Sequence, residues 1–173
     1  MSFEKALAFT LPAEGGFVDD PDDPGGATNH GITQGTYDRY RTSIDAGLQS
    51  VALISDDEVR LIYRDGYWRA GQCDKLREPL DGVHFDDCVN LGATEAARLL
   101  QEVVGAAVDG VIGPQTMAKV EEHDPVTLAQ ALCDRRAEFY RRLVAARPEN
   151  GKFLKGWLSR VAALRTQTAT VIV

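Results

Sequence analysis

The stretch EGGFVDDPDDPGGATNHGIT, residues 14–33, places one isolated glutamate where a first helix must stop and a turn-rich loop begins. Prolines and glycines impose turns on this loop. It also carries four carboxylates without a neighbouring lysine or arginine, namely Asp19, Asp20, Asp22 and Asp23. Glu14 directly precedes two glycines, so we expect its side chain at the helix end, pointing into a groove that the loop encloses. The stretch therefore favours a site built from carboxylic acids.

The composition is that of a globular chain. Of 173 residues, 44% are hydrophobic and 26% are charged, which predicts a sizeable core and no disorder. No run of about 18 apolar residues is present to span a membrane. Residues 1–16 lack the pattern of a secretory signal peptide, so we expect synthesis in the cytoplasm and no export through such a signal.

The charge distribution argues against one class of function and leaves another open. A net charge of −7 argues against nucleic-acid binding, because that affinity comes chiefly from neutralising phosphates. Residues 133–173 nevertheless hold nine Lys and Arg against three acids. Two interpretations remain for this region, a solvated helical face or a patch that meets an anionic envelope.

Helical spacing of apolar residues dominates the chain, and alternating strands are scarce. The pattern predicts a mainly α-helical fold with at most a small β-hairpin in the acidic loop. The first helix is expected to begin at about Phe3 and to end near Pro12 to Gly15. Ser55 with Glu58 predicts a capping box at the start of a second helix.

The second half of the chain reads as further helices. A long helix is expected from about His84 to Val104, with a bend near Gly92. Pro114 and the pair Asp124-Pro125 mark two later helix starts, and a last helix carries Trp157. The segment from Asp109 to Thr116 is interpreted as a capped turn and not as a ligand site.

Residue types alone leave the chemistry open. Glycosidic hydrolysis needs a carboxylic acid that protonates the leaving oxygen and a second carboxylate, and Glu14 with a loop aspartate supplies both. A carboxylic acid held against apolar groups keeps its proton to higher pH, because desolvation penalises the charged form. Acidic turns are also common as solvated loops or calcium sites, but an EF-hand register places Pro24 and Gly31 at ligand positions and fails.

No metal or cofactor site is expected from the sequence. The three histidines, His30, His84 and His123, lie far apart in the sequence. The three cysteines, Cys73, Cys88 and Cys133, show no CxxC pattern. They are interpreted as reduced thiols, with a disulfide as the alternative. Phosphate-binding and dinucleotide-binding fingerprints are also lacking.

The quoted stretch closely resembles the signature of glycoside hydrolase family 108, the N-acetylmuramidases found as phage endolysins and as secretion activator proteins. YRDGYWRAG (residues 63–71), FDDCVNLGATEAARLLQ (85–101) and VDGVIGPQT (108–116) are similar to later family segments. The resemblance implies a compact lysozyme-like fold. It also implies a catalytic region over residues 1–92 and a helical predicted peptidoglycan-binding region over 93–173, packed on the same core.

The resemblance also implies roles for individual residues. Glu14 corresponds to the family's catalytic acid, and Asp23 is the first choice for the second carboxylate, with the other loop aspartates as alternatives. Thr28 is a candidate catalytic hydroxyl, although lysozyme-like spacing would place that role at Asn29. His30 is interpreted as a residue that lines the cleft.

Four more residues are candidates for substrate binding. Asn90 is expected either to bond an acetamido group of the sugar or to bond the backbone near the helix bend. Three aromatic residues, Tyr63, Tyr67 and Trp68, are expected either to stack on sugar rings or to pack in the core.

The sequence thus predicts a monomeric muramidase that cleaves the β-1,4 bond between N-acetylmuramic acid and N-acetylglucosamine without a cofactor. A phage endolysin that reaches the cell wall through a holin or an export machine is the leading biological role. A bacterial muramidase that opens the wall for secretion, and a non-catalytic peptidoglycan-binding module, are the alternatives.

Overall fold

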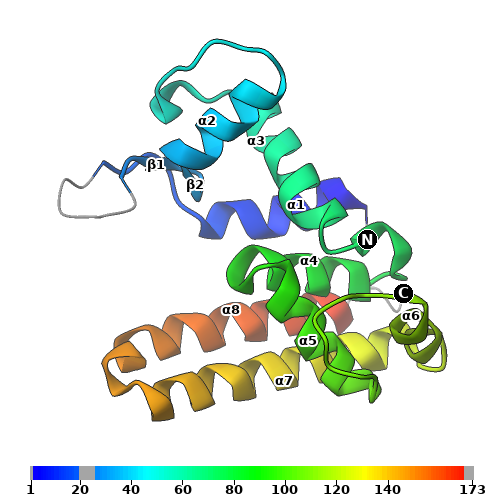
Figure 1. Cartoon of the computed structure of the whole chain (residues 1–173). Helices are drawn as coiled ribbons and strands as arrows, with labels where there is room; N and C mark the ends of the chain where they lie inside the picture. Colours follow the sequence, from blue (N-terminus) through cyan, green and yellow to red (C-terminus); the bar gives the residue numbers. More distant parts are fainter. Residues whose placement is uncertain (1, 20–25, 170–173) are drawn as a thin grey trace. The chain divides into compact units, whose positions relative to one another are not determined.

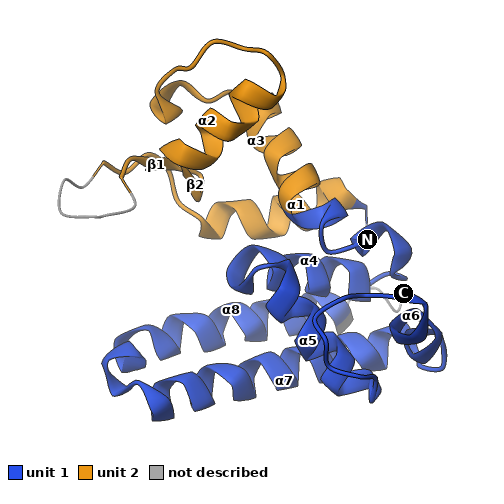
Figure 2. Cartoon of the chain, viewed as in Figure 1, with its two compact units in different colours: residues 1–2, 67–173 blue, residues 3–66 orange. Residues whose placement is uncertain are grey.

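The computed structural model describes residues 2–19 and 26–169. The chain divides into two compact units, one formed by residues 3–66 and the other by residues 1–2 and 67–173 (Figure 2). Each has its own buried core and is described separately. The predicted mainly α-helical class with one small β-hairpin is confirmed.

The described residues of the unit of residues 3–66 form α-helices and the hairpin (Figure 1). In chain order its elements are α1 (Phe3–Thr10), η1 (Leu11–Ala13), β1 (Thr28–Asn29), β2 (Ile32–Thr33), α2 (Gln34–Ser43), η2 (Val51–Leu53) and α3 (Asp56–Tyr63). A π-helical segment, η3 (Arg64–Arg69), continues α3.

Side-chain caps explain where the helices of this unit begin. The Ser55 hydroxyl accepts a hydrogen bond from the Glu58 N–H, and the Glu58 carboxylate accepts one from the Ser55 N–H, which confirms the predicted capping box. Thr33 caps α2 in the same way by accepting from the Thr36 N–H at 3.2 Å. Both helices therefore start where local sequence provides an oxygen for otherwise unpaired amides.

The hairpin turns at His30 and Gly31. Its strands pair antiparallel, with Thr28 opposite Thr33 and Asn29 opposite Ile32. Both turn residues have positive φ, 49° at His30 and 71° at Gly31, as a two-residue type I′ turn requires. The predicted small hairpin is therefore confirmed, and its tight turn follows from the glycine.

The unit of residues 67–173 is a helical assembly. Its elements are η4 (Cys73–Lys75), α4 (Leu80–Leu91), α5 (Ala93–Val104), α6 (Pro114–Glu121), α7 (Pro125–Ala146), η5 (Pro148–Asn150) and α8 (Gly151–Ala169). The two longest helices, α7 and α8, lie side by side (Figure 1). Among the described residues, no helix is both long and apolar enough to cross a membrane.

One expected helix is two helices. The segment predicted as a bent helix from His84 to Val104 starts earlier, at Leu80, and breaks completely at Gly92. Gly92 has φ +82°, which a right-handed helix cannot contain. Because this glycine caps α4 and also precedes α5, the chain turns between them.

Buried charges connect α4, α7 and α8. Arg136 donates to Asp86 at 2.7 Å and to Asp87 at 2.8 Å, and Arg160 donates to Asp86 at 2.8 Å. Asp86, Asp87 and Arg136 are fully buried. Burial opposes the charge of Asp86, but the two guanidinium groups outweigh it and lower the pKa of this carboxyl.

The turn before α6 is held by one buried amide. The Gln101 side chain donates to Asp109 at 2.7 Å and to the Val111 carbonyl at 3.0 Å, and it accepts from the Gly110 N–H at 2.8 Å. Asp109 in turn accepts from the Val111 N–H. These bonds support the interpretation of this segment as a capped turn.

Candidate active site

Glu14 lies where the first helical segment ends. Its backbone N–H bonds to the Leu11 carbonyl at 3.0 Å and closes η1, and Gly15 follows with φ +75°. The side chain is half-buried, and its Oε1 atom is buried. The predicted position of Glu14 at a helix end is confirmed.

The hairpin turn packs against this carboxyl. Gly31 approaches so closely that a Cβ atom built on it would lie 3.2 Å from Glu14 Oε2 and 3.0 Å from the Tyr63 hydroxyl. That hydroxyl donates to the His30 carbonyl at 2.8 Å. Residues from the end of η1, the hairpin and α3 are thereby brought together around one acid.

An open hollow lies beside the residues that follow Glu14 in the chain. It has a volume of about 410 Å³, and it is lined by Ala8, Leu11, Pro12, Gly15, Gly16 and His30. The lining is mostly apolar, and Gly15 and Gly16 directly follow Glu14 in the chain. The hollow therefore borders the backbone that directly follows the candidate acid.

Thr28 and Asn29 belong to the hairpin strand that leads to His30. The Thr28 hydroxyl donates to the Gly26 carbonyl at 3.3 Å, and its backbone pairs with Val18 in both directions at 2.8 Å. Asn29 is buried and donates through Nδ2 to the Val51 carbonyl at 3.2 Å. Both side chains have structural partners here, and their proposed roles toward substrate stay predictions.

Most candidates for the second carboxylate lie outside the described residues. Asp23, the first choice, lies there together with Asp20 and Asp22. Asp19 is described and exposed, directly after Val18, whose backbone pairs with Thr28. The identity of the second carboxylate therefore stays a prediction.

Three candidate sugar-binding residues belong to the other unit or to its first residues. Asn90 donates to the Asp86 carbonyl at 2.7 Å, which is the backbone bond named as one of its two alternatives. Trp68 is buried, with its ring 5.6 Å from that of Phe85 in an edge-on contact. Tyr67 is half-buried. Sugar binding by these three residues stays a prediction.

Two contacts at this site, those of the Tyr63 hydroxyl and of Gly31, were not predicted from the sequence. Nor was a cluster of cysteine and histidine side chains in the other unit. The first contact is the hydrogen bond from the Tyr63 hydroxyl to the His30 carbonyl. A buried tyrosine hydroxyl usually has a hydrogen-bond partner, and this rule could have indicated a polar contact at Tyr63. The glycine after His30 was a second signal, because a type I′ turn brings backbone close to its neighbours. Histidines were compared with histidines and cysteines with cysteines, so it was overlooked that His84 and Cys88 are four residues apart on one helix.

The fold and this site define a mainly helical, lysozyme-like protein with a half-buried glutamate at the end of its first helical segment. Comparison with known proteins gives three results. The family described as "Glycosyl hydrolase 108" matches residues 7–92, and the "Predicted Peptidoglycan domain" matches residues 95–162. The solved structure of Brucella abortus SagA is similar, with 33% sequence identity, a TM-score of 0.79 and coverage of 97% of this chain and 94% of that chain. No curated protein sequence matches.

The chain belongs to the glycosyl hydrolase 108 family. Its two matched regions make it a peptidoglycan-acting muramidase or binding module.

Proposed function

We propose that this chain is a muramidase that hydrolyses the β-1,4 bond between N-acetylmuramic acid and N-acetylglucosamine, with Glu14 as the general acid. The observation that carries the proposal is the position of the Glu14 carboxyl. It is packed against Gly31, as is the Tyr63 hydroxyl, and the two glycines that follow Glu14 line an open hollow together with His30. Because the hairpin turn at Gly31 packs closely against Glu14, it restricts the orientations of the carboxyl group. A restricted orientation favours proton transfer to one position on a bound ligand.

In the proposed reaction Glu14 protonates the oxygen that leaves with the cleaved sugar. Positive charge then develops on the ring carbon, and a second carboxylate either attacks that carbon or activates a water. Asp23 is our first choice for this group, with Asp19, Asp20 and Asp22 as neighbours. Thr28 would orient the attacking group, and Asn29 and His30 would line the cleft.

The direct test is to replace Glu14 by glutamine, which keeps size and polarity but cannot donate an acidic proton. Purified peptidoglycan should lose turbidity with the wild type and not with Glu14→Gln. We expect a rate loss of at least about 100-fold, the range of general acid catalysis. Glu14→Asp, which withdraws the carboxyl by one methylene, should lose activity while keeping the charge.

Two controls make this test decisive. Glu121→Gln changes an exposed glutamate at the end of α6 and should keep wild-type activity. Circular dichroism should show the same helical spectrum for all variants. Clearing of cell walls by Glu14→Gln at the wild-type rate would refute the assignment, and mass analysis of wild-type products should find N-acetylmuramic acid at the new reducing ends.

A binding module without catalysis is the second candidate, favoured by the peptidoglycan-domain match over residues 95–162. Sedimentation with insoluble peptidoglycan separates the two proposals. A muramidase should release soluble fragments with time, whereas a binding module should sediment with the walls and release none. Glu14→Gln should sediment as the wild type does if binding and catalysis use separate groups.

We further propose that the enzyme acts as a phage endolysin, made in the host cytoplasm as a monomer and delivered to the wall through a holin. Expression in a bacterial host should then lyse the culture only when a holin is present. Lysis or wall thinning without a holin would instead support the alternative, a muramidase that assists secretion. Light scattering of the purified protein tests the monomer.

A further inference from the structure

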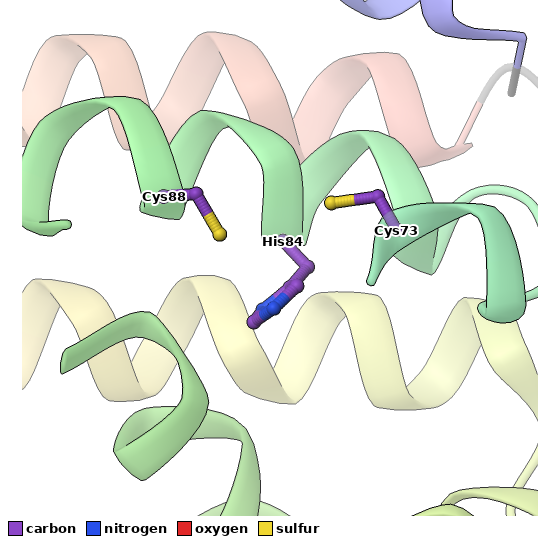
Figure 3. A group of neighbouring side chains, drawn as sticks. All are labelled: Cys73, His84 and Cys88. Atoms are coloured by element: carbon purple, nitrogen blue, oxygen red, sulfur yellow. The ribbon is translucent and has the colours of Figure 1, made fainter. Parts of the chain in front are cut away.

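Cys73, His84 and Cys88 form a buried cluster that the proposed hydrolysis does not use. His84 and Cys88 project from neighbouring turns of α4, and Cys73 approaches from η4 (Figure 3). One ligand atom from each residue lies within 4.8 Å of the other two, and all three side chains have no exposed surface. Two sulfurs and one imidazole nitrogen are a ligand set that zinc prefers.

The histidine is oriented as a metal ligand is. Its Nε2 atom lies 3.1 Å from the Gly71 carbonyl oxygen. A carbonyl oxygen only accepts, so Nε2 carries the proton and Nδ1 keeps its lone pair. Nδ1 is buried and has no hydrogen-bond partner among the described residues. Metal-binding histidines commonly donate their other nitrogen to a backbone carbonyl in this manner, which fixes the ring.

The backbone leaves room for the sulfurs. A Cβ atom on Gly71 would lie 2.4 Å from Cys88 Sγ and 3.2 Å from Cys73 Sγ, so only glycine allows both sulfurs at this position. Around a tetrahedral zinc, ligand atoms are separated by roughly 3.5 to 3.8 Å, given bond lengths of about 2.0 to 2.3 Å. Shifts of about 1 Å or less would close the observed cluster around an ion.

Charge balance favours the same conclusion. Two thiolates and one neutral imidazole cancel the charge of a divalent ion, and a neutral centre avoids the large cost of burying a net charge. Among the described residues no further Cys, His, Asp or Glu joins the group. The fourth tetrahedral position is thus left to a water molecule or another small ligand.

We propose that Cys73, His84 and Cys88 bind one zinc ion, which fastens η4 to α4. The ion would hold the segment around Gly71, including Gln72 with its φ of +54°, against the helix that carries two of the ligands. Its role is structural, and it is independent of the reaction proposed for Glu14.

The test uses the reduced, full-length protein, with Cys133→Ser as the matched control. Cys133 is also buried and free, but it lies on α7 and outside the cluster. Native mass spectrometry should find one zinc per chain in the wild type and in Cys133→Ser, and none in Cys73→Ser, Cys88→Ser or His84→Asn. Cobalt added to the metal-free wild type should give the intense visible bands of a tetrahedral site with thiolate ligands, and zinc should abolish them.

Wild-type measurements keep the proposal open to refutation even where a variant fails to fold. Zinc should raise the unfolding temperature of the metal-free wild type, and a chelator should lower it again. Absence of both zinc and cobalt binding by the wild type would overturn the proposal. So would unchanged zinc content in Cys73→Ser and Cys88→Ser.

Discussion

Gly31 determines the surroundings of the candidate acid. It combines a positive φ with a close approach to Glu14 Oε2 and the Tyr63 hydroxyl. Both features disfavour a side chain, the first through backbone strain and the second through close contact with polar atoms of the site. The absence of a side chain at residue 31 therefore allows the Glu14 carboxyl to lie where it does.

At this scale we predict that Gly31→Ala lowers turnover by about 10- to 100-fold, because displacement of a reacting group by about 1 Å has effects of that size. It should also destabilise the fold by about 1 kcal/mol, the cost of a side chain at positive φ. Initial rates on purified peptidoglycan and urea unfolding followed by circular dichroism measure the two effects.

Gly47→Ala is the control for Gly31→Ala. Gly47 is exposed and has open space around its missing Cβ, so the added methyl should change neither rate nor stability appreciably. Equal rates for the two variants would show that the hairpin turn does not position the acid.

Among the elements, α3 is tied to α2 through one carboxylate. Glu58 accepts from Ser55 in the capping box, from the Tyr37 hydroxyl at 2.8 Å and from Arg41 at 2.8 Å. Partial burial opposes its charge, but the hydrogen bonds from Ser55, Arg41 and Tyr37 outweigh burial and lower the pKa of Glu58 to about 2. The carboxylate that caps α3 therefore also connects this helix to α2.

We predict a loss of stability in acid that depends on this group. The pKa of Glu58 in the folded state lies below its ordinary value of 4.5, so the folded state holds the charged form more strongly than the unfolded state does. The resulting stability is complete above about pH 5 and is lost as the pH falls toward about 2. Urea unfolding from pH 6 to pH 2 should show this decline in the wild type.

The decline should be smaller in Glu58→Gln, which has no charge to lose, and intermediate in Ser55→Ala, which removes only the cap. The variants should also be less stable than the wild type at pH 6. If all three proteins lose stability in parallel below pH 5, the carboxylate does not carry the acid sensitivity of this part of the chain.

For the whole molecule, the division into two compact units predicts two separable unfolding events. Each unit has its own buried core, and both tryptophans, Trp68 and Trp157, lie in the unit of residues 67–173. Tryptophan fluorescence therefore reports that unit alone, and hydrogen exchange of peptides from residues 26–66 reports the other.

Arg136→Leu tests this division. The substitution leaves Asp86 and Asp87 in the core with less compensation, which typically costs about 3 to 5 kcal/mol. We expect the fluorescence-detected unfolding in urea to shift by that amount, while peptides from residues 26–66 keep their protection. Equal loss of protection in both regions would show that the chain unfolds as one cooperative body.

Features that depend on neighbours in the chain were predictable from the sequence. The capping box at Ser55, the helix starts at Pro114 and Pro125, the small hairpin and the helix-end position of Glu14 were all predicted and are confirmed. Each depends on residues within a few positions of one another, where steric and hydrogen-bonding rules act directly. The break at Gly92 was underestimated as a bend.

Contacts between distant residues could be identified only once the chain was folded. The approach of Gly31 to Glu14, the bond from Tyr63 to His30 and the meeting of Cys73 with His84 and Cys88 depend on how whole elements pack. Local patterns specify helices and turns because backbone sterics are short-ranged. They do not specify which side chains face each other across a core, because that choice minimises the free energy of all packed elements together.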